Sequence, residues 1–399
     1  MNENKSLVLS EKRIQIIVWA LLILFPILGM VIDLVSPSLP AIERSLHASS
    51  KMAKDVISIY LFGCGLGNFV TGFLTDALGR RKLICIALLG FVVISLIPVF
   101  FNSIEVLLLA RFLQGITIGA VSVLARAIFS DLLSPEKLVR LGTLIGTMWG
   151  LGPIMGPVIG GYLQTYLGWK AGFCFLAFVS FLEFIVIFFI VPETHLNRHP
   201  LNMRTIKHNL IEVTTHRMFI GLAILMGLTY SLLIVFNTAG PFLIQTRLHY
   251  SPLFFGHLAL WLGLTFLVAT FLSRYFIKKY PVEQILVGAA SLFFSIVLCV
   301  AIASYSLGHS IVVVTIATAL MYFACGLLFP MSMGKGVSLF RHIAGTATAT
   351  MYLINMLITS SVGFLVSYMH IQSATQMIWI YCALLFSVLV TYGVFIRHR

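Results

Sequence analysis

Charged side chains are scarce in this sequence. Only 10% of its 399 residues are Asp, Glu, Lys or Arg, whereas soluble globular proteins carry about 25%. Apolar residues make up 59%, which is more than one aqueous core of this size can bury. The composition therefore excludes soluble enzymes, fibrous proteins and disordered proteins, and it predicts a protein with several membrane spans.

Sequence motifs of common catalytic and cofactor sites are also missing. The chain has no Walker A sequence, no His-Glu-x-x-His and no Cys-x-x-Cys. Gly150-x-Gly152 departs from the dinucleotide-binding pattern because Met155 stands at its third glycine position. The six cysteines all lie inside apolar stretches, which argues against a disulfide framework. We expect no enzyme activity, no metal and no cofactor other than a proton gradient.

The apolar residues form runs long enough to cross a membrane. A helix needs about 20 such residues to span the hydrocarbon core. The runs are continuous rather than alternating, and lipid leaves sheet edges without partners, so a β-barrel and an open sheet are excluded. We predict an all-α membrane protein with twelve transmembrane helices near 14–35, 54–75, 83–101, 104–127, 138–165, 171–191, 217–243, 253–276, 282–304, 309–333, 341–369 and 374–396.

Basic residues are distributed unequally between the two faces of this arrangement. The chain has a net charge of +13, but its basic residues sit in short patches between apolar runs, which argues against nucleic-acid binding. The face that carries both termini holds 20 Lys and Arg, and the other face holds five. The positive-inside rule then places both termini in the cytoplasm of a multi-pass inner (cytoplasmic) membrane protein.

The two halves of the chain resemble each other. FLTDALGRRK at 73–82 matches FLSRYFIKKY at 271–280, and a Gly-Thr-x3-Thr-Met-aromatic pattern at 142–149 recurs at 345–352. The offsets of 198 and 203 predict a duplicated unit, with chance similarity in apolar sequence as the alternative. We expect pseudo-symmetric six-helix bundles at 1–191 and 217–399, joined by a cytoplasmic loop at 192–216. Such repeats are typical of transporters, with the substrate site near the midplane between them.

The loop between the second and third spans carries a motif. Gly72 and Asp76 are followed by Gly79, which permits a tight turn, and by the cations Arg80 and Arg81. Topology alone would explain the cations but not this spacing. The stretch resembles the loop motif of the major facilitator superfamily, which implies that Asp76 and Arg80 form a latch that closes the cytoplasmic side.

The match to this loop motif is incomplete. Ala77 follows the acid where the family usually has Arg, which implies a looser latch. The second half has Arg274 at the position of Asp76, so the latch would be asymmetric.

Two opposite charges lie within the predicted spans. Arg111 in the fourth span needs a partner, because an unpaired guanidinium costs at least ~3 kcal/mol in a bilayer. Asp33 in the first span lies at a similar depth in the membrane. This depth is obtained by counting the helix rise from the nearest loop to Asp33 and to Arg111. We expect these residues to pair and to couple proton movement to substrate movement, with a purely structural ion pair as the alternative.

The fifth span is rich in glycine and proline. Five glycines and two prolines lie within 150–161, and they should interrupt backbone hydrogen bonds and allow close helix approach. A packing seam is the plainer interpretation and is compatible with a transport role. The pattern resembles the antiporter motif of exporters in the superfamily, which we assign to Gly152, Pro153, Gly156, Pro157, Gly160 and Gly161.

Further stretches resemble one branch of the superfamily, the 12-span drug:proton antiporters of the Bcr/CflA type. They are the Asp-x-x-x-Pro-x-Leu-Pro stretch at 33–40, the segment at 125–131 and the entry to the eighth span at 250–256. Val35 stands where the branch commonly has Tyr. The resemblance implies two halves that move about a central, largely apolar cavity.

Other polar residues in the spans are candidates for the site. Glu183 in the sixth span is either a second proton carrier or a neutral residue at a helix contact. The remaining candidates would line the cavity, although Tyr and Trp are also ordinary membrane-interface residues. They are Tyr60, Asn68, Gln114, Trp149, Tyr230, Asn237, Tyr352 and Asn355.

The combined features predict a monomeric, proton-coupled exporter of small amphipathic molecules such as drugs. Its partners would be the substrate, protons and lipid. A dedicated exporter of an endogenous metabolite, such as a siderophore, and a proton-symport importer remain alternatives. A receptor or scaffold without transport is a further alternative, disfavoured because the longest polar segment has only about 25 residues.

Overall fold

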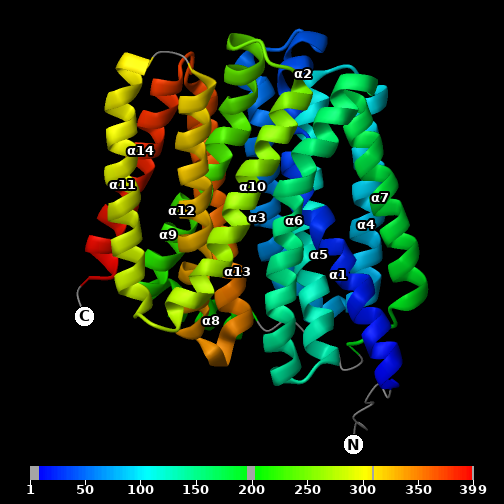
Figure 1. Ribbon diagram of the computed structural model, residues 1–399. Helices are drawn as coiled ribbons and strands as arrows, with labels where there is room; N and C mark the ends of the chain where they lie inside the picture. Colours follow the sequence, from blue (N-terminus) through cyan, green and yellow to red (C-terminus); the bar gives the residue numbers. More distant parts are fainter. Residues whose placement is uncertain (1–8, 196–202, 308–309, 398–399) are drawn as a thin grey trace, which may run out of the picture.

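The computed structural model describes residues 9–195, 203–307 and 310–397 (Figure 1). The first half contains α1 (Glu11–Asp33), η1 (Ser36–Ser38), α2 (Leu39–Ser45), α3 (Ser50–Leu78), α4 (Arg80–Phe100), α5 (Ile104–Leu132), α6 (Pro135–Leu167) and α7 (Trp169–Ile190). After α8 (Met203–Thr215), the second half contains α9 (Arg217–Pro241), η2 (Phe242–Arg247), α10 (Pro252–Ile277), α11 (Val282–Leu307), α12 (Ile311–Ser338), η3 (Arg341–Ile343), α13 (Ala344–Tyr368) and α14 (Ala374–Phe395).

Twelve helical segments of the described residues are long and apolar enough to cross a membrane. The all-α fold with twelve spans is therefore confirmed. Large apolar side chains such as Phe100, Phe189 and Trp261 are more than 60% exposed on the outside of the bundle. Exposed apolar surface of this kind is expected where lipid replaces water as the solvent.

Local sequence determines where several helices begin and how they connect. Ser49 and Ser251 precede α3 and α10, and each side-chain oxygen accepts a hydrogen bond from a backbone N–H in the first turn. Gly79 and Gly168 are the one-residue connections from α3 to α4 and from α6 to α7. Both have φ above +80°, a conformation that favours glycine. The tight turn expected at Gly79 is therefore present.

The helices form two six-helix bundles that meet along two helix pairs. In Figure 1, α1, α4, α5, α6 and α7 lie on one side and α9, α11, α12 and α14 on the other. α3 packs along α13, and α6 packs along α10, so these pairs form the boundary between the halves. A displacement of one half against the other must therefore move these two contacts.

Two faces of the bundle are distinguished below. The terminal face is the one where α1 begins at Glu11 and α14 ends at Phe395, and the distal face is the one where α1 ends at Asp33 (Figure 1). Hydrogen bonds join the halves near the distal face. One of them runs from Lys54 Nζ in α3 to the backbone oxygen of Met369, just after α13 (3.1 Å).

Candidate functional site

Asp33 lies at the contact between the two halves. It is the last residue of α1, where the chain leaves the α-helix for the short η1 turn. Its carboxylate Oδ1 accepts a hydrogen bond of 2.6 Å from Nδ2 of Asn237 in α9. Both side chains are buried, at 3% and 2% exposure. The acid of the first helix is therefore bonded to the opposite half of the protein.

Two further hydrogen bonds surround this contact. Ser36 Oγ donates to the backbone oxygen of Asn237 (2.7 Å), and Gln245 Nε2 in η2 donates to the backbone oxygen of Pro37 (2.9 Å). Asn237 Oδ1 is buried without a hydrogen-bond partner. The end of α1 and the end of α9 are thus joined by side chains from both halves.

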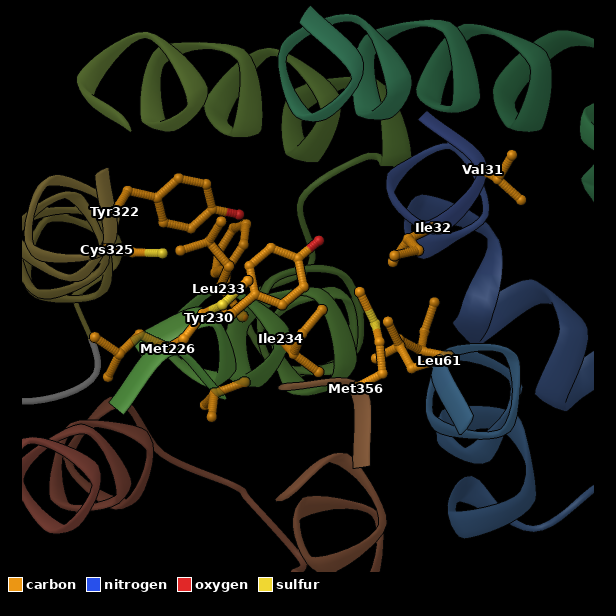
Figure 2. Close-up of a cluster of buried hydrophobic side chains, with 14 of the residues drawn as sticks. Val31, Ile32, Leu61, Met226, Tyr230, Leu233, Ile234, Tyr322, Cys325 and Met356 are labelled. Carbon is orange, nitrogen blue, oxygen red and sulfur yellow. The ribbon is translucent and has the colours of Figure 1, made fainter. Parts of the chain in front are cut away.

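Three buried tyrosine side chains lie near Asp33 in an otherwise apolar region. Tyr60 of α3, Tyr230 of α9 and Tyr322 of α12 each interact electrostatically with Asp33. Figure 2 shows the hydroxyl groups of Tyr230 and Tyr322 pointing from the second half toward α1. The apolar side chains of this cluster include Val31, Ile32, Leu61, Leu233, Ile234 and Met356 (Figure 2). An acid and several hydroxyl groups among apolar and aromatic side chains suit a small amphipathic molecule.

The expected ion pair between Asp33 and Arg111 is not present in this structure, which corrects that prediction. Arg111 is fully buried in α5, where its Nε donates to the backbone oxygen of Val56 (3.1 Å) and its Nη1 donates to Gln114 Oε1 (3.0 Å). Its Cζ lies 4.2 Å from the centre of the Tyr60 ring. Helix rise gives depth but not the direction in which a side chain points, and Arg111 points toward α3.

Polar residues around Arg111 form a network within the first half. Gln114 Nε2 donates to Ser95 Oγ of α4 (2.7 Å), so α3, α4 and α5 are linked through Arg111 and Gln114. Asn68 of α3 is bonded on both sides of its amide, to the backbone oxygen of Cys64 (3.0 Å) and to Ser122 Oγ of α5 (2.9 Å). The structure therefore places Gln114 and Asn68 in helix contacts of the first half.

The glycines of α6 pack directly against α1. A Cβ on Gly152 would collide with Gly29, and a Cβ on Gly160 would collide with the backbone of Leu34. Between them, a Cβ on Gly156 would lie 3.0 Å from the Cβ of Asp33. The close contact expected for this motif is present, and Gly156 places it against the candidate acid. α6 stays helical through Pro153 and Pro157, and each proline leaves out one backbone hydrogen bond because it has no N–H.

The other side of α6 contacts the second half. Pro157 and Gly161 lie against the start of α10: a Cβ on Gly161 would lie 2.8 Å from the backbone oxygen of Pro252, and a Cβ on Gly256 would lie 2.5 Å from that of Pro157. Pro153 lies one turn earlier in α6, next to Ile154, which packs on Gly263. The motif therefore packs against both α1 and α10.

Glu183 lies away from the boundary between the halves. It is in α7, which packs against α4, and its side chain is 6% exposed. Its Oε2 is buried without a hydrogen-bond partner. The structure therefore does not bring Glu183 together with Asp33.

Arg80 lies in a charged cluster at the terminal face. Its Nε donates to Asp131 Oδ2 (3.1 Å), its backbone N–H donates to Glu193 Oε1 (2.9 Å), and its Nη1 donates to Thr75 Oγ1. Thr194 Oγ1 also donates to Asp131 Oδ2 (2.7 Å). Arg80 is thus tied to the ends of several helices of the first half.

The other predicted gate residues lie close to this cluster. Arg81 Nη2 donates to the backbone oxygen of Phe188 (2.6 Å), and a Cβ on Gly72 would lie 3.5 Å from Ala349 of α13. The side chain of Asp76 lies outside the described part of the chain. The structure adds Asp131 as a carboxylate partner of Arg80.

The remaining cavity candidates lie on α6 and α13. Tyr352 packs its ring under the guanidinium of Arg126 from α5, with 4.5 Å between the Arg126 Cζ and the ring centre. Asn355 is 1% exposed and accepts a hydrogen bond from Thr359 (3.3 Å). Trp149 is partly buried, and its backbone oxygen faces Gly29 of α1. Of these three, Tyr352 forms a contact between the halves.

The predicted site residues include neither Ser36 and Gln245, which join the ends of α1 and α9, nor Tyr322 and Ser95. Tyr322 lies in a predicted span and is amphipathic like Tyr230, so the same criterion would have found it. Ser95 gave no signal, because serine is common in apolar helices. Within residues 9–195, 203–307 and 310–397, the structure shows no group of three or more side chains that could hold a metal ion.

Comparison with known proteins identifies the family. A family model described as "Major Facilitator Superfamily" matches residues 21–364. The chain is 26% identical to the bicyclomycin resistance protein homolog of Haemophilus influenzae, over 95% of this chain and 94% of that one. It is 24% identical to the multidrug resistance protein MdtL of Salmonella heidelberg, over 85% and 84% of the two chains.

A solved structure agrees with the fold. The crystal structure of a D-xylose-proton symporter superposes with a TM-score of 0.76 at 15% identity, covering 96% of this chain and 98% of the other. At this identity the likeness describes the fold alone. The family match and the named relatives indicate a transporter rather than an enzyme. The chain belongs to the major facilitator superfamily.

Proposed function

We propose that this protein exports small amphipathic molecules across the inner membrane in exchange for protons. The names of relatives over most of the chain, bicyclomycin resistance protein homolog and multidrug resistance protein, support an export role. The glycine-rich packing of α6 against α1 and α10 supports a mechanism in which the halves move against each other. No ATP-binding motif is present in the sequence, so an ion gradient is the energy source we propose.

The observation that carries the proposal is the place of Asp33. Ionisable residues within membrane spans are expensive to bury and are functional by default. Asp33 is such an acid, and it contacts the second half through Asn237 and the helix α6 through Gly156. A change in its charge therefore acts on the contacts that must rearrange when the halves move.

Asp33 would alternate between binding substrate and binding a proton. In the ionised form its carboxylate attracts a donor group of the substrate, and the hydroxyl groups of Tyr60, Tyr230 and Tyr322 supply further hydrogen-bonding groups. When a proton binds to the carboxylate, this attraction is lost and the substrate is released. Arg111 would support the site through Tyr60, since its guanidinium packs on that ring.

The sidedness of the proposal comes from the basic residues. The terminal face would be cytoplasmic, because the sequence segments predicted for that face carry 20 Lys and Arg residues against five for the other face. The distal face, where Asp33 and Asn237 are bonded, would then be periplasmic. The cluster of Arg80 and Asp131 would stabilise the terminal ends of the first half during the cycle.

Transport by inverted membrane vesicles tests the proposal. Vesicles that contain the protein are acidified inside by respiration and given fluorescent amphipathic amines, such as ethidium, together with bicyclomycin. We expect uptake into the vesicles that stops when an ionophore collapses the pH gradient, and no such uptake with Asp33→Asn. Gradient-driven movement in the opposite direction would indicate an importer, and uptake that survives the ionophore would exclude proton coupling.

A further inference from the structure

We propose that Asn237 is the positioning residue through which the second half senses the state of Asp33. Its amide would hold the empty, ionised transporter closed at the distal face. The inference rests on the proposed role of Asp33. It adds a contact that keeps the empty, ionised transporter from changing conformation.

The contacts of Asn237 place it at the junction of the halves. Its Nδ2 donates to Asp33 Oδ1 at 2.6 Å, and its backbone oxygen accepts from Ser36 Oγ at 2.7 Å. One residue of α9 is thus held by both the last residue of α1 and the first residue of η1. Asp33 and Asn237 are 204 residues apart, which matches the repeat offsets of 198 and 203 in the sequence. They therefore occupy nearly equivalent positions in the two bundles.

This contact must separate when the distal face opens. The bonds from Asn237 and Gln245 to residues 33–37 join segments of different halves, so a relative movement of the halves that opens this face breaks them. A hydrogen bond to an ionised carboxylate is about twice as strong as one between neutral groups. The bond from Asn237 therefore contributes most to holding the distal face closed while Asp33 is ionised and free of substrate.

The groups around Asp33 leave Asn237 as its main polar partner. The titratable side chains near Asp33 on neighbouring helices are Tyr60 of α3, Tyr230 of α9 and Tyr322 of α12, each of which is affected by the charge of Asp33. The α6 surface against it is Gly156, which has no side chain. Within the described residues, no Lys, Arg or His forms an ion pair with Asp33. The amide of Asn237 is thus the side-chain donor that the structure gives to its carboxylate.

Substrate and proton would both release this contact. A substrate donor group that binds to Asp33 competes with Nδ2 for the carboxylate, and the unpartnered Oδ1 of the same amide is an acceptor for that group. A proton on Asp33 removes the charge and weakens the bond. The loaded or protonated transporter can then change state, whereas the empty ionised one is held. An exchanger needs this restriction, because free movement of the empty carrier would let protons cross without substrate.

A proton-leak measurement without substrate tests the inference. Purified protein is reconstituted into liposomes that contain a pH-sensitive dye, and a pH gradient is imposed. Asn237→Leu keeps the side-chain size and removes the amide, and we expect proton entry about tenfold above wild type. Thr238→Val is the matched control, since Thr238 is the next residue, fully buried, with an Oγ1 that has no hydrogen-bond partner. It should leak no more than wild type.

A second measurement reports the conformation directly. Spin labels at Leu46 and Arg247 of the distal face should show a larger share of long distances in Asn237→Leu than in Thr238→Val at alkaline pH. If Asn237→Leu is not folded, Asn237→Ser replaces it in both assays, with the same expectation. Leak and distances equal to those of the control would overturn the inference.

The outcome for Asp33 separates this inference from the proposed function. If Asp33→Asn still couples protons to transport, the proposed function fails. If Asp33→Asn loses coupling while Asn237→Leu behaves like Thr238→Val, the proposed function stands and only the role of Asn237 is wrong.

Discussion

Gly156 of α6 and Asp33 of α1 are packed so closely that a Cβ on the glycine would lie 3.0 Å from the Cβ of the acid. The same atom would lie 3.1 Å from the backbone nitrogen of Leu34. A helix that bears the glycine-rich motif is thus in direct contact with an acid at the junction of the halves. Substitutions of Gly156 and Asp33 therefore test helix packing and proton coupling at the same contact.

Gly156→Leu is expected to block the conformational cycle. A leucine side chain would force α6 away from α1, because small residues allow these helices to approach closely. Distances between spin labels on the distal face should no longer change when substrate or acid is added. Gly146→Leu is the control, since a Cβ there meets no atom within 4 Å. Normal exchange between states in Gly156→Leu would refute the packing argument.

Arg111→Ala is expected to destabilise the first half and to impair transport. The change removes hydrogen bonds to Val56 and Gln114 and the contact with the Tyr60 ring, and loss of a charged hydrogen bond costs about 1.5–3 kcal/mol. Arg111→Lys keeps the charge but not the planar fork, so it should retain part of both stability and activity. Thermal unfolding in detergent checks whether stability falls from wild type to Arg111→Lys and then to Arg111→Ala. Equal stability of wild type and Arg111→Ala would show that the network is not structural.

Arg80→Ala is expected to slow transport while substrate affinity stays within a few-fold of wild type. The side chain joins helix ends at the terminal face through Asp131 and Thr75, far from Asp33. Asp76→Asn should behave in the same way if the loop acts as a latch. Equilibrium binding to purified protein and the rate of vesicle transport are measured side by side. A large loss of affinity in both variants would contradict a gating role.

Glu183→Gln is expected to leave proton-coupled transport intact. Glu183 lies in α7, its Oε2 has no hydrogen-bond partner, and it is not at the junction of the halves. A neutral amide of the same shape avoids burying a charge, so thermal stability should not fall. The vesicle assay and thermal unfolding check both expectations. Loss of coupling in this variant would make Glu183 a proton carrier in its own right.

The sequence was sufficient for the fold. Long apolar runs in a chain with few charges allow little other than membrane helices, and the twelve predicted spans are present. The turn at Gly79 and the close packing of Gly152 and Gly156 also followed from residue type, since only glycine permits a positive φ or such close contact without strain.

The partners within the site could not be derived in the same way. Asp33 and Arg111 have similar depths along their helices, but depth does not fix which neighbour a side chain faces. Asp33 instead contacts Asn237 from the other half, and Arg111 contacts Val56 and Gln114. Pairing between segments about 200 residues apart depends on the way the bundles dock, which periodicity and spacing do not encode.

Proton release on substrate addition tests the central claim, that Asp33 exchanges a proton for substrate. Wild type and Asp33→Asn are solubilised in weakly buffered detergent at mildly acidic pH, and a compound that the wild type transports in the vesicle assay is added. We predict that the wild type acidifies the solution and that Asp33→Asn does not, although it remains folded. Equal proton release from both proteins would contradict the account and place the coupling acid elsewhere.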